Sequence, residues 1–181
     1  MERDAANRLT RAGVSIILRM RPLRYLYVLA LVLWLGGMAV AGLVVAPITF
    51  GVLQAWDPAT GRVLAGQVFG AVLQRVYLIG YIAAVVMFVV LTVQRVLGPR
   101  PHAYGIRAGL LGLMLGLIVY SGLWLSPRID QLQAQVTGPM NLLAVEDPRR
   151  VEFDGLHSLS TALTMAAIAG GLVLLAWETR E

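Results

Sequence analysis

The chain has 181 residues, of which 58% are hydrophobic and 14% are charged, and its formal net charge is +5. Soluble domains contain about 45–50% apolar and about 25% charged residues, so this composition is typical of a membrane protein. The chain has no cysteine, which excludes disulfides, thiolate metal sites and thiol nucleophiles. The arginines adjoin apolar segments, which favours a membrane surface over nucleic acid as their partner.

The first 24 residues form an arginine-rich segment with a short apolar stretch. This stretch, LTRAGVSIILRM, is bounded by arginines and is typical of a helix that lies along a membrane surface. A secretory signal peptide is the alternative, because Ala39 and Ala41 resemble a cleavage signature. The uncharged run from Tyr25 to Trp56 is much longer than the apolar region of a signal peptide, which has about 7–15 residues. We therefore predict an interfacial segment over residues 1–24 and then a retained spanning helix.

Four segments are long and apolar enough to cross a bilayer, which takes about 20 residues. The dipeptide Asp147-Pro148 marks the start of the last of them, with Asp147 as its N-cap. We expect one membrane domain over residues 25–177 and a tail over residues 178–181. The predicted helices cover residues 25–53, 63–97, 105–127 and 150–177.

The connections between these helices differ in charge. The N-terminal segment is rich in arginine, and residues 95–107 contain three arginines and no acid. The long connection over residues 128–154 carries five acids. By the positive-inside rule, both termini and the 95–107 loop face the cytoplasm. The predicted fold class is all-α: an integral membrane four-helix bundle with both termini cytoplasmic and a short N-terminal interfacial segment.

Small residues recur at helical spacing in the first three predicted helices. Such faces let helix backbones approach closely in lipid. We therefore predict that these glycines pack the helices of the bundle together, while a surplus small face is also suited to receive another subunit. The predicted packing glycines are Gly37, Gly66, Gly70, Gly105, Gly109, Gly112 and Gly116.

A polar stripe runs along the last predicted helix. Asp154, His157, Thr161 and Thr164 follow helical spacing, and Ser160 lies beside them. Polar side chains in hydrocarbon are costly without partners, so we expect this stripe to face protein.

Charged residues near the outer ends of the predicted helices share one depth. Arg75 is followed by nineteen uncharged residues, Arg128 follows the third helix directly, and His157 lies twenty residues before Trp177. The layer has two interpretations. It is either a small site for an ion, a metal or a headgroup, or a structural network in which its arginines pair with its aspartates. The predicted outer polar layer consists of Arg75, Arg128, Asp130, Asp154, His157 and Ser160.

His157 is a weak candidate as a metal ligand. Haem b would need a second axial ligand at similar depth, whereas His102 lies at the opposite membrane face and Met38 near the middle of the first helix. Copper would prefer clustered sulfur and imidazole ligands, and the methionines are scattered. We predict no cofactor and no metal, with haem or copper as the least favoured alternatives.

The common catalytic motifs are missing from the sequence. It has no HExxH, no GxSxG and no phosphate-binding loop with its lysine. No acidic residue falls near the middle of a predicted span, where a proton pump would carry one. We therefore predict that the protein is not an enzyme.

Four stretches resemble a known family: LWLGGMAVAGLVVAPITFGVL, AGQVFGAVLQRVYLIG, YSGLWLSPRIDQLQ and FDGLHSLSTALTM. In this order they resemble the transmembrane protein 205-like family, whose bacterial members are mostly catalogued as a domain of unknown function. The resemblance implies a four-helix membrane protein, and eukaryotic members are associated with tolerance to platinum drugs. The first helix is also similar, more weakly, to the copper-resistance protein CopD, although it carries no histidine. The family pattern corresponds to Gly37, Pro47, Phe50, Gly66, Arg75, Asp130, Phe153, His157 and Ser160.

The predicted function is that of an accessory or structural subunit of a larger bacterial membrane assembly, for example a respiratory or photosynthetic one. All 15 basic residues are arginine, a bias typical of GC-rich bacterial genomes, so we expect a multi-pass protein of the inner membrane. The alternatives are a small transporter or metal- or drug-tolerance protein that uses the outer polar layer and, least favoured, a haem- or copper-binding redox protein. The expected partners are the lipid bilayer and other membrane subunits or a second copy, and no nucleic acid.

Overall fold

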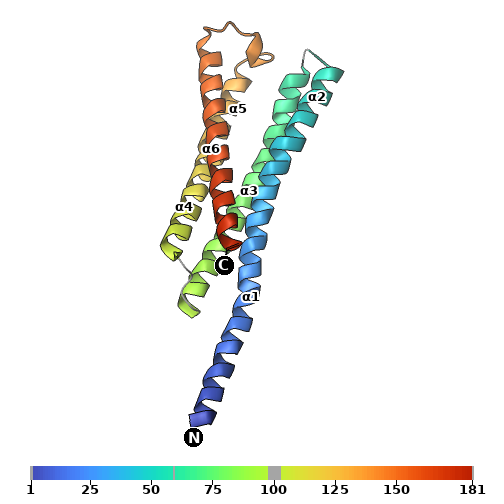
Figure 1. Ribbon diagram of the computed structural model, residues 1–181. Helices are drawn as coiled ribbons and strands as arrows, with labels where there is room; N and C mark the ends of the chain where they lie inside the picture. The colour runs from blue at the N-terminus through green and yellow to red at the C-terminus, as the bar shows by residue number, and fades with distance from the viewer. Residues whose placement is uncertain (1, 59, 98–102, 181) are drawn as a thin grey trace.

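The computed structural model describes residues 2–58, 60–97 and 103–180, with residues 2–20 described by their backbone alone. Helices make up almost all of this part of the chain, and no strand occurs in it (Figure 1). The helices in chain order are α1 (Glu2–Val40), the π-helix η1 (Ala41–Val45), α2 (Ala46–Trp56), α3 (Gly61–Leu97), α4 (Tyr104–Tyr120), the π-helix η2 (Ser121–Leu125), α5 (Ser126–Ala134), the 3₁₀-helix η3 (Met140–Leu142) and α6 (Pro148–Glu178).

Four continuous helical spans are long and apolar enough to cross a membrane. They are Arg21–Trp56, Gly61–Leu97, Tyr104–Ala134 and Pro148–Glu178. The predicted fold class, an all-α bundle of four membrane-length helices, is therefore confirmed. The third span runs seven residues beyond its predicted end at residue 127, because Pro127 lies in the first turn of α5, where its missing N–H costs nothing.

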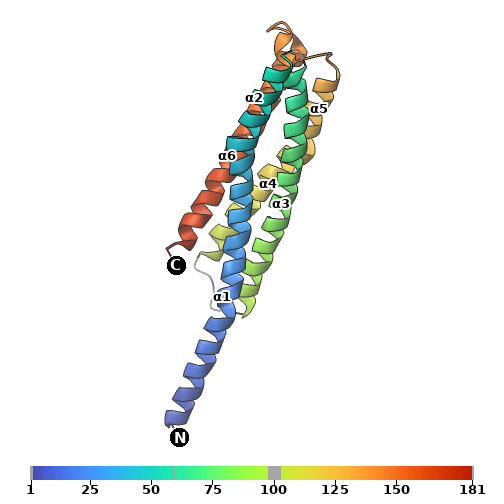
Figure 2. The same ribbon diagram turned by 90° about the vertical axis from the view of Figure 1, so that its right-hand side faces the viewer.

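Both chain ends lie at the same end of the bundle (Figure 1). Figure 2 shows α1 continuing in line beyond the other helices toward the N-terminus. The predicted boundary at residue 24 is not marked by a break, because α1 is one helix from Glu2 and includes Pro22. Leucine and arginine, which favour a helix, are the commonest residues from Leu18 to Leu29.

The first and third spans each contain a π-helical turn two residues before a proline. Proline has no backbone N–H and clashes with the carbonyl four residues earlier in an α-helix. In η1 the N–H of Ala46 bonds to the carbonyl of Ala41, and in η2 the N–H of Ser126 bonds to the carbonyl of Ser121. This shift by one residue places each proline at the start of a new α-helical stretch, so both spans continue through it.

The two bulges reveal that the chain consists of two similar halves. The sequence AGLVVAP at 41–47 corresponds to SGLWLSP at 121–127, eighty residues later. In each half a bulged span is followed by an uninterrupted helix, α3 or α6. Both α1 and α4 pack against α3 and against α6, so the four spans form a ring in the order α1, α3, α4, α6. The halves run in the same direction and are related approximately by a two-fold axis along the bundle.

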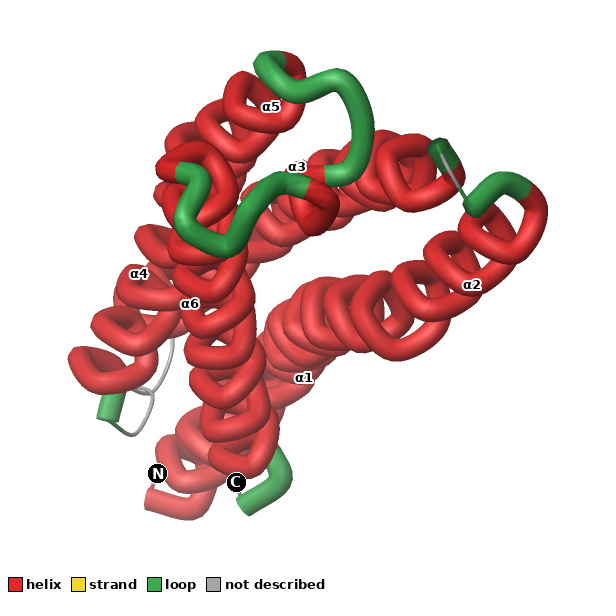
Figure 3. Tube along the Cα trace, turned by 90° about the horizontal axis from the view of Figure 1, so that it is seen from above, coloured by secondary structure: helices red, strands yellow, loops and turns green. Residues whose placement is uncertain are grey.

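The core lies in the half of the bundle that holds the chain ends. Its largest fully buried side chains include Trp34, Tyr27 and Met87. In contrast, α2 has no buried residue, and the buried residues of α6 begin only at Ala167. Figure 3 shows α2 and α3 lying apart from α5 and α6 at the opposite end. The bundle is therefore tightly packed near the termini and splayed at the other end.

Asp147 caps α6, as predicted, and the cap should depend on pH. The side chain of Asp147 accepts a hydrogen bond from the N–H of Arg149 (2.9 Å), and hydrogen bonds with the Arg149 guanidinium hold the pKa of Asp147 below its usual range. A depressed pKa in the folded state stabilises above the ordinary value of about 4, and this stabilisation is lost as the pH falls through the lower, folded value. After correction for intrinsic rates, hydrogen exchange at Val151, whose N–H bonds to the carbonyl of Asp147, should accelerate only below about pH 4. An Asp147→Asn variant should lose this pH dependence, and an unchanged profile in that variant would contradict the assignment.

Candidate functional site

The predicted outer polar layer is distributed over three helices, and its ion pairs differ from the prediction. Arg128 of α5 donates two hydrogen bonds to one carboxylate oxygen of Glu152 on α6, at 2.9 and 2.7 Å. Asp154 lies 3.8 Å from Arg150, one turn earlier on the same helix. Both members of the Arg128–Glu152 pair are more than 40% exposed, so the pair contributes less than about 1 kcal/mol. It joins α5 to α6 as a local clasp.

The remaining members of the layer do not join this clasp. Arg75 and Asp130 are exposed, and neither makes a hydrogen bond or ion pair with another described residue. His157 is exposed and stacks on Phe153, with the ring centres 6.0 Å apart. Ser160 is half-buried. No group of three or more acidic or histidine residues that could hold a metal ion is found in the described part of the chain.

The polar stripe of α6 is only partly covered by protein, in contrast to the expectation. Asp154, His157 and Thr161 are exposed, whereas Ser160 and Thr164 are half-buried. The stripe continues, at spacings of seven residues, the face of α6 that is buried at Gly171 and Glu178, and its first turns are exposed because the bundle is splayed at that end. The hydroxyl of Thr161 donates a hydrogen bond to the carbonyl of His157, at 3.0 Å. A hydroxyl that bonds within its own helix needs no partner from another helix, which explains why Thr161 can remain exposed.

The glycines that bring helices together are mostly not those predicted. A β-carbon at Gly80 would lie 2.9 Å from Nε1 of Trp34, and one at Gly170 would lie 2.9 Å from Cγ of Met114. A β-carbon at Gly122 or Gly171 would lie closer still, to side chains of Tyr81 and Leu35 respectively. Of the predicted glycines, three meet ordinary contacts of 3.5 to 3.8 Å: Gly37, Gly66 and Gly112. The other four would meet no atom within 4 Å: Gly70, Gly105, Gly109 and Gly116.

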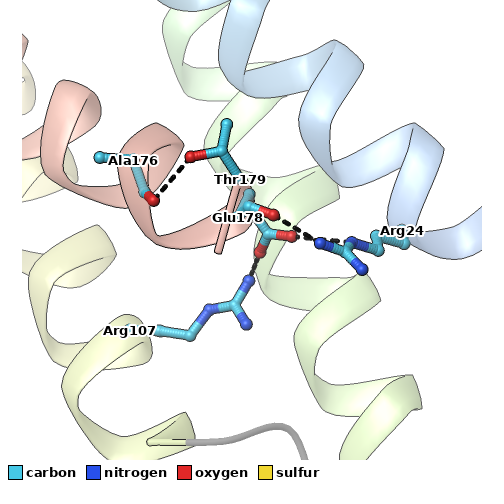
Figure 4. Close-up of polar contacts among 5 residues, drawn as sticks. All are labelled: Arg24, Arg107, Ala176, Glu178 and Thr179. Atoms are coloured by element: carbon cyan, nitrogen blue, oxygen red, sulfur yellow. Dashed lines mark hydrogen bonds and ion pairs between the residues drawn. The ribbon is translucent and has the colours of Figure 1, made fainter. Parts of the chain in front are cut away.

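The most buried charged groups lie at the opposite, tightly packed end. Arg24 of α1, Arg107 of α4 and Glu178 of α6 meet there, and we call them the arginine–glutamate cluster (Figure 4). Arg107 forms an ion pair with the carboxylate of Glu178, and each of these side chains is 4% exposed. Nε of Arg24 lies 3.2 Å from the same carboxylate, and Nη2 of Arg24 donates to the backbone carbonyl of Glu178. The guanidinium of Arg107 lies 5.2 Å from the centre of the Tyr27 ring, within reach of a cation–π interaction.

The topology of the chain explains why the three residues of the cluster lie together. Arg24 precedes the first apolar run, Arg107 lies in the first turns of α4, and Glu178 is the last residue of α6. All three therefore lie at the same end of the bundle. The cluster is absent from the predicted site because Glu178 falls in the predicted tail. A usable signal exists, since Glu178 continues the inward face of α6 that includes Gly171 and Leu174, at spacings of seven and four residues.

Comparison with known proteins places the chain in a family. The sequence model of a family described as a domain of unknown function, DUF4149, matches residues 29–137. The chain belongs to the DUF4149 family. No curated protein and no solved structure matches the chain. The match supports the predicted resemblance to a domain of unknown function, but not its closer assignment to the transmembrane protein 205-like family or to CopD.

The DUF4149 match covers both proline-associated bulges and ends before α6. Glu178 therefore lies outside the matched region, whereas Arg107 lies inside it. In this DUF4149 protein the cluster does two things chemically. It neutralises a buried carboxylate with two guanidinium groups, and it ties α6 to α1 and α4. Because Arg24 remains 43% exposed, one side of the cluster is open to its surroundings.

Proposed function

We propose that this DUF4149 protein is a non-enzymatic accessory subunit of a larger membrane assembly, and that it resides in a bacterial inner membrane with both termini cytoplasmic. The observation that supports the proposal is an open row of glycines on α4. We call this row the α4 ridge, and it consists of Gly105, Gly109, Gly112 and Gly116.

The α4 ridge lies on the outside of the bundle. Its members are spaced at i, i+4, i+7 and i+11, so they lie on one narrow stripe of the helix, and all four are exposed. At Gly112 an added β-carbon would lie 3.7 Å from Cζ of Phe88, which is ordinary contact, and at the other three it would meet nothing within 4 Å. The packing of this chain therefore does not require glycine at these positions.

The α4 ridge is suited to close packing against a helix of another subunit. Helices in lipid gain little from hydrophobic burial against each other, so close backbone packing along small residues drives their association. Glycine within a helix costs about 0.5–1 kcal/mol relative to alanine. Four glycines facing lipid would weaken α4 without any gain, whereas a helix from another subunit seated on the ridge would approach the backbone closely.

The size of the native complex tests this proposal. Membranes are solubilised in a mild detergent and the protein is sized by native electrophoresis. The wild type should migrate in a complex several times larger than the 19.6 kDa chain. A Gly109→Leu/Gly116→Leu variant should migrate as the isolated chain, because two added side chains fill the ridge. Gly36→Leu, at an exposed glycine of α1 with no atom within 4 Å of an added β-carbon, should leave the complex intact. A wild type that migrates alone, or only as copies of itself, would contradict the proposal.

A small transporter is the second candidate, and one observation favours it. The two proline-associated bulges occupy corresponding positions in the two halves, and in transporters such paired interruptions often mark the binding site. Beside η2, the hydroxyls of Tyr77 and Ser121 are buried and have no hydrogen-bond partner among the described residues. A transport role predicts that Tyr77→Phe and Ser121→Ala fail to restore the tolerance of a deletion strain to a panel of metal salts at unchanged protein amount. An accessory role predicts that both variants restore whatever the wild type restores.

A further inference from the structure

The arginine–glutamate cluster carries more positive than negative charge. Its two guanidinium groups face one carboxylate, and Figure 4 shows Glu178 between Arg24 and Arg107. The pair of Arg107 and Glu178 is buried and already neutral as a unit. The excess positive charge therefore belongs to Arg24, whose side chain is the exposed member of the cluster.

Arg24 is held in position by Glu178 and still has N–H donors for a ligand. Its Nε and Nη2 atoms contact Glu178, at the carboxylate and at the backbone carbonyl. A guanidinium group has five N–H donors in a planar fork. Because 43% of the side chain is exposed, donors remain on the outer side of the group. A guanidinium that is held rigid in this way loses little freedom when it binds, and its geometry matches the oxygens of a phosphate.

Other cationic side chains lie close along the chain. Arg21 is one helical turn before Arg24 and therefore lies on the same face of α1. Arg180 follows the end of α6 two residues after Glu178, and both of these arginines are exposed. Tyr25, next to Arg24, is 73% exposed, and exposed tyrosines are typical of the headgroup level of a membrane.

We propose that Arg24, together with Arg21 and Arg180, binds the phosphate of an anionic phospholipid headgroup at this end of the bundle. The positive-inside rule leads us to expect that this end faces the cytoplasm, where the leaflet surface carries anionic lipids. In the proposed site Arg24 supplies the oriented donors, Arg21 and Arg180 supply further positive charge, and Glu178 holds Arg24 in place. The site lies on α1 and α6 and is independent of the α4 ridge.

Lipid titration of the purified protein tests this site. The protein in neutral detergent is titrated with phosphatidylglycerol or with phosphatidylcholine, and bound lipid is counted by native mass spectrometry. We expect one phosphatidylglycerol to bind more tightly than any phosphatidylcholine. Arg24→Gln should weaken that binding by about tenfold, as expected for the loss of a charge-assisted contact. Arg21→Gln should weaken phosphatidylglycerol binding by a smaller factor. Because Arg21 is not a member of the arginine–glutamate cluster, this substitution should leave the fold intact.

The lipid titration has a control variant and three outcomes that would overturn the proposal. Arg62→Gln removes an exposed arginine at the opposite end of the bundle and should leave the titration unchanged. Equal binding of the two lipids, or an equal loss in the Arg62 and Arg21 variants, would overturn the proposal. Displacement of phosphatidylglycerol by millimolar inorganic phosphate would show that the arginines take free phosphate and would overturn the assignment to a lipid. Circular dichroism of each variant in the same detergent verifies that the helices are intact.

Discussion

Replacing Glu178 with glutamine is expected to lower the free energy of unfolding by about 3–5 kcal/mol. The substitution removes the charge that neutralises Arg107, whose side chain is only 4% exposed and cannot turn to solvent. A buried charge that has lost a carboxylate partner costs far more than the ion pair itself contributes. The measurement is reversible unfolding in mixed micelles, monitored by tryptophan fluorescence.

Two further variants serve as controls for the Glu178→Gln result. Glu152→Gln breaks the exposed ion pair with Arg128 at the other end of the bundle and should cost less than about 1 kcal/mol. Arg107→Met combined with Glu178→Leu replaces both charges by apolar groups and should recover most of the lost stability. If Glu178→Gln and Glu152→Gln cost the same, the cluster does not hold the packed end together.

Replacing Gly122 with alanine is expected to destabilise the bundle by about 1–3 kcal/mol. The added methyl group would collide with the hydroxyl of Tyr81 and lie 3.0 Å from Cδ2 of Tyr77. The Tyr81 hydroxyl cannot move freely, because it donates a hydrogen bond to the carbonyl of Ile118 at 3.2 Å. The same unfolding assay measures the effect.

A second substitution should relieve this collision. Tyr81→Phe removes the hydroxyl, and the loss of its interhelical hydrogen bond should cost only about 0.6 kcal/mol. The Gly122→Ala/Tyr81→Phe variant should then be more stable than the sum of the two single changes predicts. Gly116→Ala, a glycine of the same span with open space around it, should be neutral or slightly stabilising. Equal losses at Gly122 and Gly116 would refute the close approach of α3 to η2.

The number and type of the helices could be predicted because they depend on length and apolar content alone. The nineteen uncharged residues Val76–Gln94 are long enough to span a bilayer. In lipid, a single segment can pair all its backbone N–H and C=O groups internally only as a helix. The ends of the spans were harder to place. Pro127 is typical of a helix boundary, yet the π-turn before it lets the third span continue to Ala134. The repetition of AGLVVAP as SGLWLSP is the signal in the sequence for both bulges and for the two-fold arrangement.

The candidate sites were harder to predict, for a physical reason. Helical spacing shows which residues share a face, but it does not show which neighbour that face meets. The α4 ridge was correctly grouped on one face, and this face points away from the bundle. The stripe of α6 lies on the face that is buried at Gly171 and Glu178, but Thr161 is exposed because the helices are splayed at its level. Glu178 lies beyond the apolar run, so hydropathy assigns it to solvent. Its burial follows from packing, because Arg24 and Arg107 approach it from two other helices.

Cross-linking in native membranes tests most directly whether the α4 ridge receives another subunit. Leu113 flanks the ridge and is 59% exposed, and Leu43 on η1 is 79% exposed and serves as the control. A photoreactive benzophenone residue is placed at either position, and the membranes are irradiated before solubilisation. If another subunit packs on the ridge, position 113 should give a discrete adduct with a different protein. This adduct should be lost when Gly109→Leu and Gly116→Leu are added, and position 43 should give no such adduct. Adducts with lipid alone at position 113 would show that the ridge faces lipid and would contradict its role as a subunit interface.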